Sequence, residues 1–374
     1  MSTLARLAVA ATSVAAAATG IASGPAQAAP AQATPHVVFV QNDDPAGNTV
    51  VAYDRTASGG LTQVGSYRTG GLGGVLAGSV VDHLASEGSL TYDARTHLLY
   101  AVNAGSSSIT VFAVAGDRLT RLQVIGSGGS FPVSVAADGG RVFVLNARDG
   151  GSVQGFVLVG RRLVRVPAWH RDLGLDPEQT PEFTSTPGQI GFTPDGQRLV
   201  VTTKNGGNSV LVFQAGPGRL QAPVVTSLPG TVPFGFAFDS RGHLALTEAG
   251  PSAVATFGVA RNGTLTALDT AATSQAATCW VVANGSTVYA SNAGSGTLST
   301  YRVGQAGDLT ARGTTATDKG TVDAAVSSDG DYLYAQTGAA GVVDAFRIGS
   351  DGSLTATGSV TVPDAAGAEG IVAL

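Results

Sequence analysis

The chain has 374 residues, of which 52 are glycine, and only 13% carry a charged side chain, against roughly 25% in an average globular domain. With 43% hydrophobic residues, the chain is too apolar to be disordered as a whole. A net charge of −5 and only two lysines exclude the basic face that nucleic-acid binding needs, and the single cysteine, Cys279, excludes an intrachain disulfide.

The first residues have the features of a secretory signal. Residues 1–21 carry one positive charge followed by an uncharged run of small and apolar residues, and two small-x-small sites follow at Ala26–Ala28 and Ala31–Ala33. These regions in this order are typical of a signal peptide. The apolar run is weaker than the about 20 strongly apolar residues of a spanning helix. We expect residues 1–33 to be a bacterial signal peptide with a short leader, residues 34–374 to be one exported domain, and the chain to have no membrane span.

One sequence unit recurs seven times from residue 36 to the end of the chain. The clearest copy, LLYAVNAGSSSITVFAVAGDRLTRL from Leu98, contains two alternating runs joined by an Asn/Gly turn, and a leucine that opens the next run. An aromatic residue marks the register of each copy, at Tyr53, Phe112, Phe156, Phe213, Phe257, Tyr301 and Phe346. Successive markers are 59, 44, 57, 44, 44 and 45 residues apart, so the basic period is near 44 residues and two copies are followed by an insertion.

Each unit holds four short runs in which apolar and polar residues alternate. In the second unit these runs lie at about 88–92, 98–103, 109–113 and 119–125. Such alternation indicates half-buried strands, and the Asn-Ala-Gly and Asp-Gly pairs between them favour tight hairpins. Four antiparallel strands in about 44 residues are typical of a propeller blade, whereas a β-solenoid would have shorter repeats and parallel strands. We predict an all-β fold, a seven-bladed β-propeller of four-stranded antiparallel blades.

The two ends of the chain are expected to share one blade. No innermost strand precedes residue 36, and the chain ends with AEGIVAL at residues 368–374, which resembles the innermost strands predicted at 131–138 and 232–239. The C-terminal strand would then join the N-terminal blade from the inside. This pairing closes the ring and leaves no free edge in that blade.

Both insertions fall between the outermost strand of one blade and the innermost strand of the next, at about 69–87 and 166–187. In an up-and-down blade this connection lies on the same face as the turn between the second and third strands. We call this face of the ring the mouth. Elaborate loops at one end of a central channel are where a propeller usually binds its ligand.

Polar and aromatic residues of these segments are our candidates for binding a ligand at the mouth. They come from the two insertions and from the starts of inner strands: His83, Glu87, His170, Arg171, Trp280, Asp323 and Glu369. Asp82 and Trp169 belong to the same segments. The ordinary alternatives are that the histidines and acids solvate the loops and that Trp280 packs in the core.

Glu248 is the best candidate for chemistry. It ends a second strand where other copies carry asparagine, as at Asn103, Asn146 and Asn292. A carboxyl group in an apolar rim can have a raised pKa and act as an acid or a base. No zinc-type histidine pair, phosphate-binding loop or calcium loop is present, so we expect neither a metal ion nor a cofactor.

The repeats resemble those of the lactonase-type seven-bladed propellers, the family of the propeller 6-phosphogluconolactonases and carboxymuconate cyclases. The resemblance is carried by LLYAVNAGSSSITVFAV at 98–114, GQIGFTPDGQRLVVTT at 188–203 and TVYASNAGSGTLSTYRV at 287–303, and it covers nearly the whole exported part. Enzymes of that family typically show an Arg-His pair before F-x-P-D-G and an Asn-Glu-Leu run one blade later. Here the first place ends in Gln189 and the second keeps Glu248.

The resemblance implies a lactonase-like hydrolase or cycloisomerase that acts at the mouth, and with the signal-like segment we expect a secreted enzyme for a small uncharged or aromatic-derived lactone. Glu248 would be the acid or base, and Gln189 would assist with a histidine or arginine of the loops. The alternative is a non-catalytic propeller that binds a small molecule, a glycan or a protein through the same face. The sequence leaves open whether the chain is an enzyme. We expect a monomer with no nucleic-acid partner.

Overall fold

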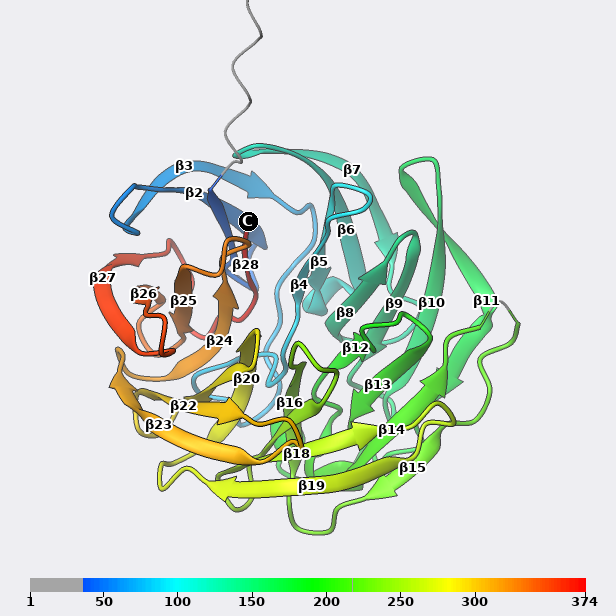
Figure 1. The fold of residues 1–374 in the computed structure, drawn as a ribbon. Helices are drawn as coiled ribbons and strands as arrows, with labels where there is room; N and C mark the ends of the chain where they lie inside the picture. The colour runs from blue at the N-terminus through cyan, green and yellow to red at the C-terminus, as the bar shows by residue number, and fades with distance from the viewer. Residues whose placement is uncertain (1–35, 217) are drawn as a thin grey trace, which may run out of the picture. The chain divides into compact units, whose positions relative to one another are not determined.

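The computed structural model describes residues 36–374 except residue 217, and the predicted signal peptide lies outside these residues. The described residues form seven four-stranded antiparallel sheets, which are the blades of a ring (Figure 1). The predicted seven-bladed β-propeller is confirmed. Within the described part, no helix is both long enough and apolar enough to cross a membrane.

The strands of each blade follow one another from the channel outward, except that the last strand of the chain lies innermost in blade 1. Blades 1 to 3 are β28 (Ile371–Ala373), β1 (Val37–Gln41), β2 (Thr49–Arg55), β3 (Leu61–Arg68); β4 (Leu90–Asp93), β5 (Leu98–Asn103), β6 (Ser108–Ala115), β7 (Arg118–Gly126); and β8 (Pro132–Asp138), β9 (Arg141–Asn146), β10 (Ser152–Val159), β11 (Arg162–Asp172). Blades 4 and 5 are β12 (Ile190–Phe192), β13 (Arg198–Thr202), β14 (Ser209–Gln214), β15 (Val224–Ser227); and β16 (Pro233–Phe238), β17 (Leu244–Glu248), β18 (Ala253–Val259), β19 (Leu265–Ala272). Blades 6 and 7 are β20 (Thr278–Asn284), β21 (Thr287–Asn292), β22 (Thr297–Val303), β23 (Leu309–Ala316); and β24 (Thr321–Val326), β25 (Tyr332–Thr337), β26 (Val342–Ile348), β27 (Leu354–Thr361). Short helical turns lie between strands at η1 (Ala104–Ser106), α1 (Glu182–Ser185) and α2 (Lys204–Gly207).

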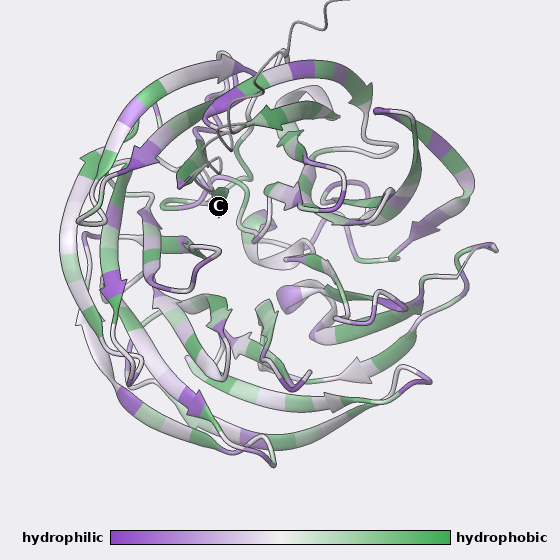
Figure 2. Ribbon diagram, turned by 45° about the horizontal axis from the view of Figure 1, so that its top comes forward, coloured by the Kyte–Doolittle hydropathy of each residue, from purple (hydrophilic) through white to green (hydrophobic). Residues whose placement is uncertain are grey.

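Burial differs between the inner and the outer strands of a blade. Every residue of β5 is buried, because a neighbouring blade covers each face of this strand. Residues of the outermost strand β23 are mostly exposed. Figure 2 shows hydrophobic and hydrophilic segments alternating along the outer strands. The predicted half-buried strands are therefore wrong for second strands such as β5, which are buried on both faces.

The ring closes as predicted. β28 pairs antiparallel with β1, with Ala373 opposite Val38 and Ile371 opposite Val40. A side-chain pair also joins the first and last blades on the face opposite the mouth, where the guanidinium of Arg55 donates to the carboxylate of Asp329 (Nη1 to Oδ1, 3.1 Å). The first and last strands of the chain thus pair in one sheet, and a side-chain contact joins blade 1 to blade 7.

Candidate functional site

The first insertion, residues 69–89, covers the mouth instead of standing around it. The cyan segment between β3 and β4 runs across the middle of the ring in Figure 1. Backbone hydrogen bonds tie it to distant parts of the ring, from Gly105 N to Gly73 O (3.1 Å), from His83 N to Gly367 O (2.7 Å) and from Glu87 N to Gly188 O (3.2 Å). The insertion is therefore folded into the mouth and contacts the turns predicted to lie on that face.

The second insertion, residues 173–189, interlocks with the first. The Glu182 carboxylate accepts hydrogen bonds from Ala77 N (2.6 Å) and from Arg148 Nε (2.7 Å). Burial raises the pKa of Glu182, but these hydrogen bonds and the charge of Arg148 outweigh it, so the pKa lies below its ordinary value. One ion pair thus connects blade 3 with both insertions.

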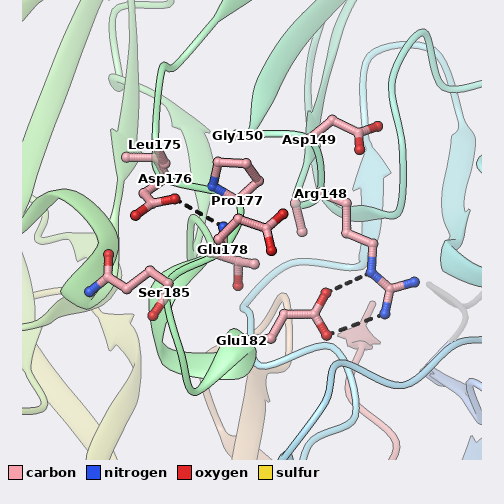
Figure 3. Close-up of a pocket in the computed structure, with 12 residues that line it drawn as sticks. Arg148, Asp149, Gly150, Leu175, Asp176, Pro177, Glu178, Glu182 and Ser185 are labelled. Carbon is pink, nitrogen blue, oxygen red and sulfur yellow. Dashed lines mark hydrogen bonds and ion pairs between the residues drawn. The ribbon is translucent and has the colours of Figure 1, made fainter.

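A polar pocket of about 180 Å³ lies between the turn after β9 and the second insertion (Figure 3). In Figure 3 the guanidinium of Arg148 faces the carboxylate of Glu182, and the two groups form an ion pair. The other charged lining residues are Asp149, Asp176 and Glu178, all acidic. This pocket contains none of the predicted site residues and holds no spare cation for an anionic transition state.

Three of the predicted binding residues, Glu87, Asp323 and Glu369, meet as buried groups in the central channel. The Glu87 carboxylate accepts from Val281 N (3.2 Å), that of Asp323 from Ile371 N (3.3 Å), and that of Glu369 from Gly88 N (2.7 Å). The contacts of Glu87 and Glu369 link the first insertion to blade 6 and to the start of the last strand of the chain, and the contact of Asp323 links blade 7 to blade 1. The acidic residues therefore join parts of the ring and do not merely solvate a loop.

The channel carboxyls hold protons more tightly than ordinary acids. Burial and the neighbouring charges raise the pKa of Asp323 to about 7, and they raise those of Glu87 and Glu369 well above the usual range. Sequence reasoning missed a further member, Asp43, whose pKa burial raises to about 7. In residues 36–374 without 217, no group of three or more such side chains has a geometry that could hold a metal ion.

A second pocket, of about 150 Å³, lies between the first insertion and the inner strands of blades 5 and 6, and we call it the mouth pocket. Phe234 and Trp280 line it with their ring centroids 5.0 Å apart at 60°. The Trp280 indole donates from Nε1 to Ser86 O (2.6 Å), which fixes the ring against the insertion. Trp280 is thus both a packing residue and a wall of a pocket.

Asp82 is the carboxylic acid among the residues that line the mouth pocket. Its two oxygens accept from Leu84 N (2.8 Å) and Ser86 N (2.8 Å). Burial raises the pKa of Asp82 to about 6, although these hydrogen bonds and the charge of Lys204 act in the opposite direction. The group is therefore mostly a carboxylate at pH 7 and can still accept a proton.

Lys204, which no sequence motif marked, lies buried behind the mouth pocket. Its ammonium donates to Ala85 O (2.6 Å), Phe183 O (2.6 Å) and Thr186 Oγ1 (2.9 Å). Its place at the start of a turn resembles that of ordinary turn residues in other blades. The only signal that could have drawn attention to it is the scarcity of lysine in the chain.

Glu248 and Gln189, the predicted catalytic pair, do not share a hydrogen bond in the described part of the chain. Glu248 ends β17, and burial raises its pKa. The next residue, Ala249, packs against Phe234 and Trp280, but Glu248 is not among the residues that line the mouth pocket. The Gln189 amide oxygen accepts from Phe236 N (2.6 Å). A catalytic role for either residue stays a prediction.

His83 lies in the mouth, half-buried and close to Gly367, where a Cβ atom would overlap the imidazole ring. Burial lowers the pKa of His83. The structure does not place it among the residues that line the mouth pocket. It therefore contributes to the fit between the first insertion and the last connection of the chain.

His170 and Arg171 do not belong to the second insertion, and a role for them in binding a ligand stays a prediction. Both belong to β11, the outermost strand of blade 3, where they lie opposite Gln154 and Val153 of β10. This strand continues to residue 172 because Trp169 stacks on Phe143 (centroids 5.3 Å apart) and holds its end against the blade. The second insertion accordingly begins later than predicted.

The family model described as "Lactonase, 7-bladed beta-propeller" matches residues 50–369. The chain belongs to this lactonase family. None of the curated protein sequences matches it significantly.

Solved structures share the fold of this lactonase-family propeller. They include a provisionally assigned 6-phosphogluconolactonase of Bacteroides fragilis, with 18% identity over 92% of this chain and 100% of the other and a TM-score of 0.71. A Lactobacillus plantarum protein has 20% identity over 91% and 99% of the two chains and a TM-score of 0.71. The Pseudomonas aeruginosa periplasmic gluconolactonase PpgL has 19% identity over 87% and 96% and a TM-score of 0.69. At these identities the likeness concerns the fold alone.

Proposed function

We propose that this protein hydrolyses small uncharged lactones in the mouth pocket. The observation that carries the proposal is Asp82, a buried carboxyl with a pKa of about 6 that lines an apolar pocket. A cavity of about 150 Å³ holds a benzene-sized molecule, so a lactone ring of five or six atoms fits. A phosphorylated lactone would be disfavoured, because the hydrogens of Lys204 are already used by protein oxygens.

In the proposed reaction, Asp82 accepts a proton from a water molecule whose oxygen attacks the lactone carbonyl carbon. The bond between that carbon and the ring oxygen then breaks. The proton passes from Asp82 to the ring oxygen, and a hydroxy acid leaves. Trp280 and Phe234, which pack edge to face on each other, would form one apolar wall against the lactone ring. Membership in the lactonase family supports this chemistry.

The second candidate is binding of a small apolar molecule without turnover. It is favoured because the side-chain hydrogen-bond donors of Trp280 and Lys204 already have acceptors within the protein. The Trp280 indole donates to Ser86 O, and all three hydrogens of Lys204 have acceptors. Lactone opening needs a donor for the developing oxyanion, so a site without a free donor would bind and not react.

The hydrolysis of δ-valerolactone, γ-butyrolactone and 6-phosphogluconolactone, followed by proton release at pH 7, tests the proposal. We expect turnover of the uncharged rings, a loss of about 100-fold or more in Asp82→Asn, and no change in Asp54→Asn, which alters an exposed carboxyl. Loss in Glu248→Gln but not in Asp82→Asn would move the site to Glu248. Absence of turnover together with saturable quenching of Trp280 fluorescence would establish the binding candidate. Absence of both would contradict the proposal.

We also propose that the protein is exported. The signal-like residues 1–33 and the periplasmic gluconolactonase among the structural relatives support this proposal. Expression in a bacterial host with a Sec pathway tests it. The secreted protein should begin at Ala29 or Thr34 when its mass is measured, and retention of the full-length chain inside the cells would contradict export.

A further inference from the structure

Lys204 is one of two lysines in the chain, and its side chain is 1% exposed. It stands at the start of α2, in the turn between the second and third strands of blade 4. A lysine without water is costly unless its ammonium is fully hydrogen-bonded. The other lysine, Lys319, is exposed. The chain therefore contains one lysine whose position needs an explanation and one that serves as a control.

The ammonium of Lys204 joins the two insertions to blade 4. It donates to Ala85 O in the first insertion and to Phe183 O and Thr186 Oγ1 in the second. Only the protonated amine has three hydrogens, so all three acceptors are satisfied only in the charged form. Ala85 and Phe183 both line the mouth pocket. One charged group thus holds two walls of the pocket.

Lys204 also lies close to an aromatic residue that lines the mouth pocket. Its Nζ atom lies 5.3 Å from the ring centroid of Phe234, another lining residue. Burial lowers the pKa of Lys204 to about 7, and the titratable groups that act on it in the opposite direction are Asp82, Cys279 and Glu182. Its positive charge in turn lowers the pKa of Asp82. Removal of this charge should therefore make Asp82 harder to ionise.

We infer that Lys204 is the positioning residue of the mouth pocket: through its three hydrogen bonds it sets the spacing of the two loop walls. Its effect on turnover rests on the proposed function. Its effect on the walls does not, because it follows from hydrogen bonds within the protein. The influence of its charge on Asp82 gives a second readout. The test therefore uses readouts that need no lactone.

Fluorescence of Trp280 reports the ionisation of Asp82. The chain has two tryptophans, so Trp169→Phe leaves Trp280 alone, and its indole bonds to Ser86, whose amide donates to Asp82. We expect the emission to titrate near pH 6, and the Asp82→Asn variant in this background to lose that transition. Lys204→Met should move the midpoint up by about one pH unit. Lys204→Arg should largely restore it, and Lys319→Met should leave it unchanged.

Alkylation of the sole cysteine reports the spacing of the walls. Cys279 lines the mouth pocket, and burial raises its pKa to about 12, so iodoacetamide should react slowly with the native protein. We expect Lys204→Met to raise the rate at least about 10-fold, and Thr186→Val, which removes one acceptor, to raise it by a smaller factor. If Lys204→Met does not fold, Thr186→Val and Lys204→Arg carry the test.

An unchanged midpoint and an unchanged alkylation rate in folded Lys204→Met would overturn the inference, and so would an unchanged alkylation rate in Thr186→Val if Lys204→Met does not fold. A shifted midpoint and faster alkylation, in a protein that turns over no lactone, would support the role of Lys204 and reject the proposed hydrolysis. The two proposals can therefore fail separately.

Discussion

Folding raises the pKa of the Glu369 carboxyl well above its ordinary value, chiefly because the group is buried. One carboxylate oxygen accepts from Gly88 N (2.7 Å) and Ser89 N (3.2 Å). The other oxygen is buried and has no hydrogen-bond donor among the described residues, but the carboxyl of Asp323 lies within hydrogen-bonding reach of the Glu369 side chain. Two carboxylates have no hydrogen to share, so the pair must retain a proton where isolated acids would have lost theirs.

Glu369→Gln should mimic the protonated acid. The amide oxygen can accept from Gly88 and Ser89, and the amide nitrogen can donate to Asp323. We expect an increase in the free energy of unfolding of about 1 kcal/mol at pH 8 and little change at pH 5, measured by urea denaturation. Glu178→Gln, at an exposed carboxyl, is the matched control. A change of the same size at both pH values would show that the pair takes up no proton when the chain folds.

The first insertion depends on close contact with the turns of the ring. A Cβ atom at Gly338, in the turn between the second and third strands of blade 7, would overlap the carbonyl oxygen of Val81. Leu76 and Leu84 of the insertion are fully buried. The insertion is thus packed as an element of the core, although it contains no regular secondary structure between β3 and β4.

Gly338→Ala should therefore displace the insertion at Val81. We expect a loss of about 1–3 kcal/mol of stability and faster alkylation of Cys279, because Val81 also lines the mouth pocket. Gly126→Ala is the control, since its Cβ atom would meet no atom within 4 Å. A Gly338→Ala protein as stable as the control would contradict this packing.

The blades could be predicted from the sequence because each copy buries the same aromatic marker, such as Phe112 or Phe156, between two sheets. The end of β11 could not, because Pro167 normally interrupts a strand. Only the pairing with β10, which is shifted between Gln154 and Phe156, shows that this edge strand continues beyond the proline to Asp172. Asp43 and Lys204 were missed for a related reason. Each lies in a turn, and it is the folded insertions that surround it with other buried groups.

At the scale of the whole molecule, the ring depends on the pairing of β28 with β1. Ile371 is buried, and its amide donates to Asp323 in blade 7 (3.3 Å). Loss of β28 would expose the edge of β1 and remove the channel contacts of Glu369. The last seven residues therefore contribute to blades 1 and 7 together.

Deletion of residues 368–374 should unfold the protein as one unit, with a loss of about 4 kcal/mol or more from buried side chains alone. Calorimetry of the truncated and full-length proteins measures this loss. An unchanged melting transition in the truncated protein would reject the role of β28 in closure.

The channel acids should give the protein an unusual pH dependence. Burial raises the pKa values of Asp43 and Asp323 to about 7 and that of Asp82 to about 6, and it raises those of Glu87 and Glu369 well above the usual range. In the unfolded chain these groups lose their protons near pH 4. Between about pH 4 and 7 the folded state therefore binds more protons, and its stability falls as the pH rises.

We expect the melting temperature to be higher at pH 5 than at pH 8. The free energy of unfolding should fall by up to about 1.4 kcal/mol per pH unit for each proton that the folded state releases in excess of the unfolded state. Asp329 and Glu182 act in the opposite sense, because hydrogen bonds from arginines lower their pKa values, and the stability that they contribute is lost only in acid below about pH 4. His83 and Lys204 also act in the opposite sense, because burial lowers the pKa of His83 and lowers that of Lys204 to about 7, so stability from these two groups rises with pH. Differential scanning calorimetry at constant ionic strength measures the balance. A melting temperature that rises from pH 5 to pH 8 would contradict the protonated channel.

A crystal structure of the Asp82→Asn protein soaked with δ-valerolactone tests most directly whether the mouth pocket is the ligand site. We expect density for one lactone ring in the mouth pocket, against Trp280 and Phe234 and beside residue 82. Density at the Arg148–Glu182 pocket of Figure 3 or beside Glu248, with the mouth pocket empty, would contradict it.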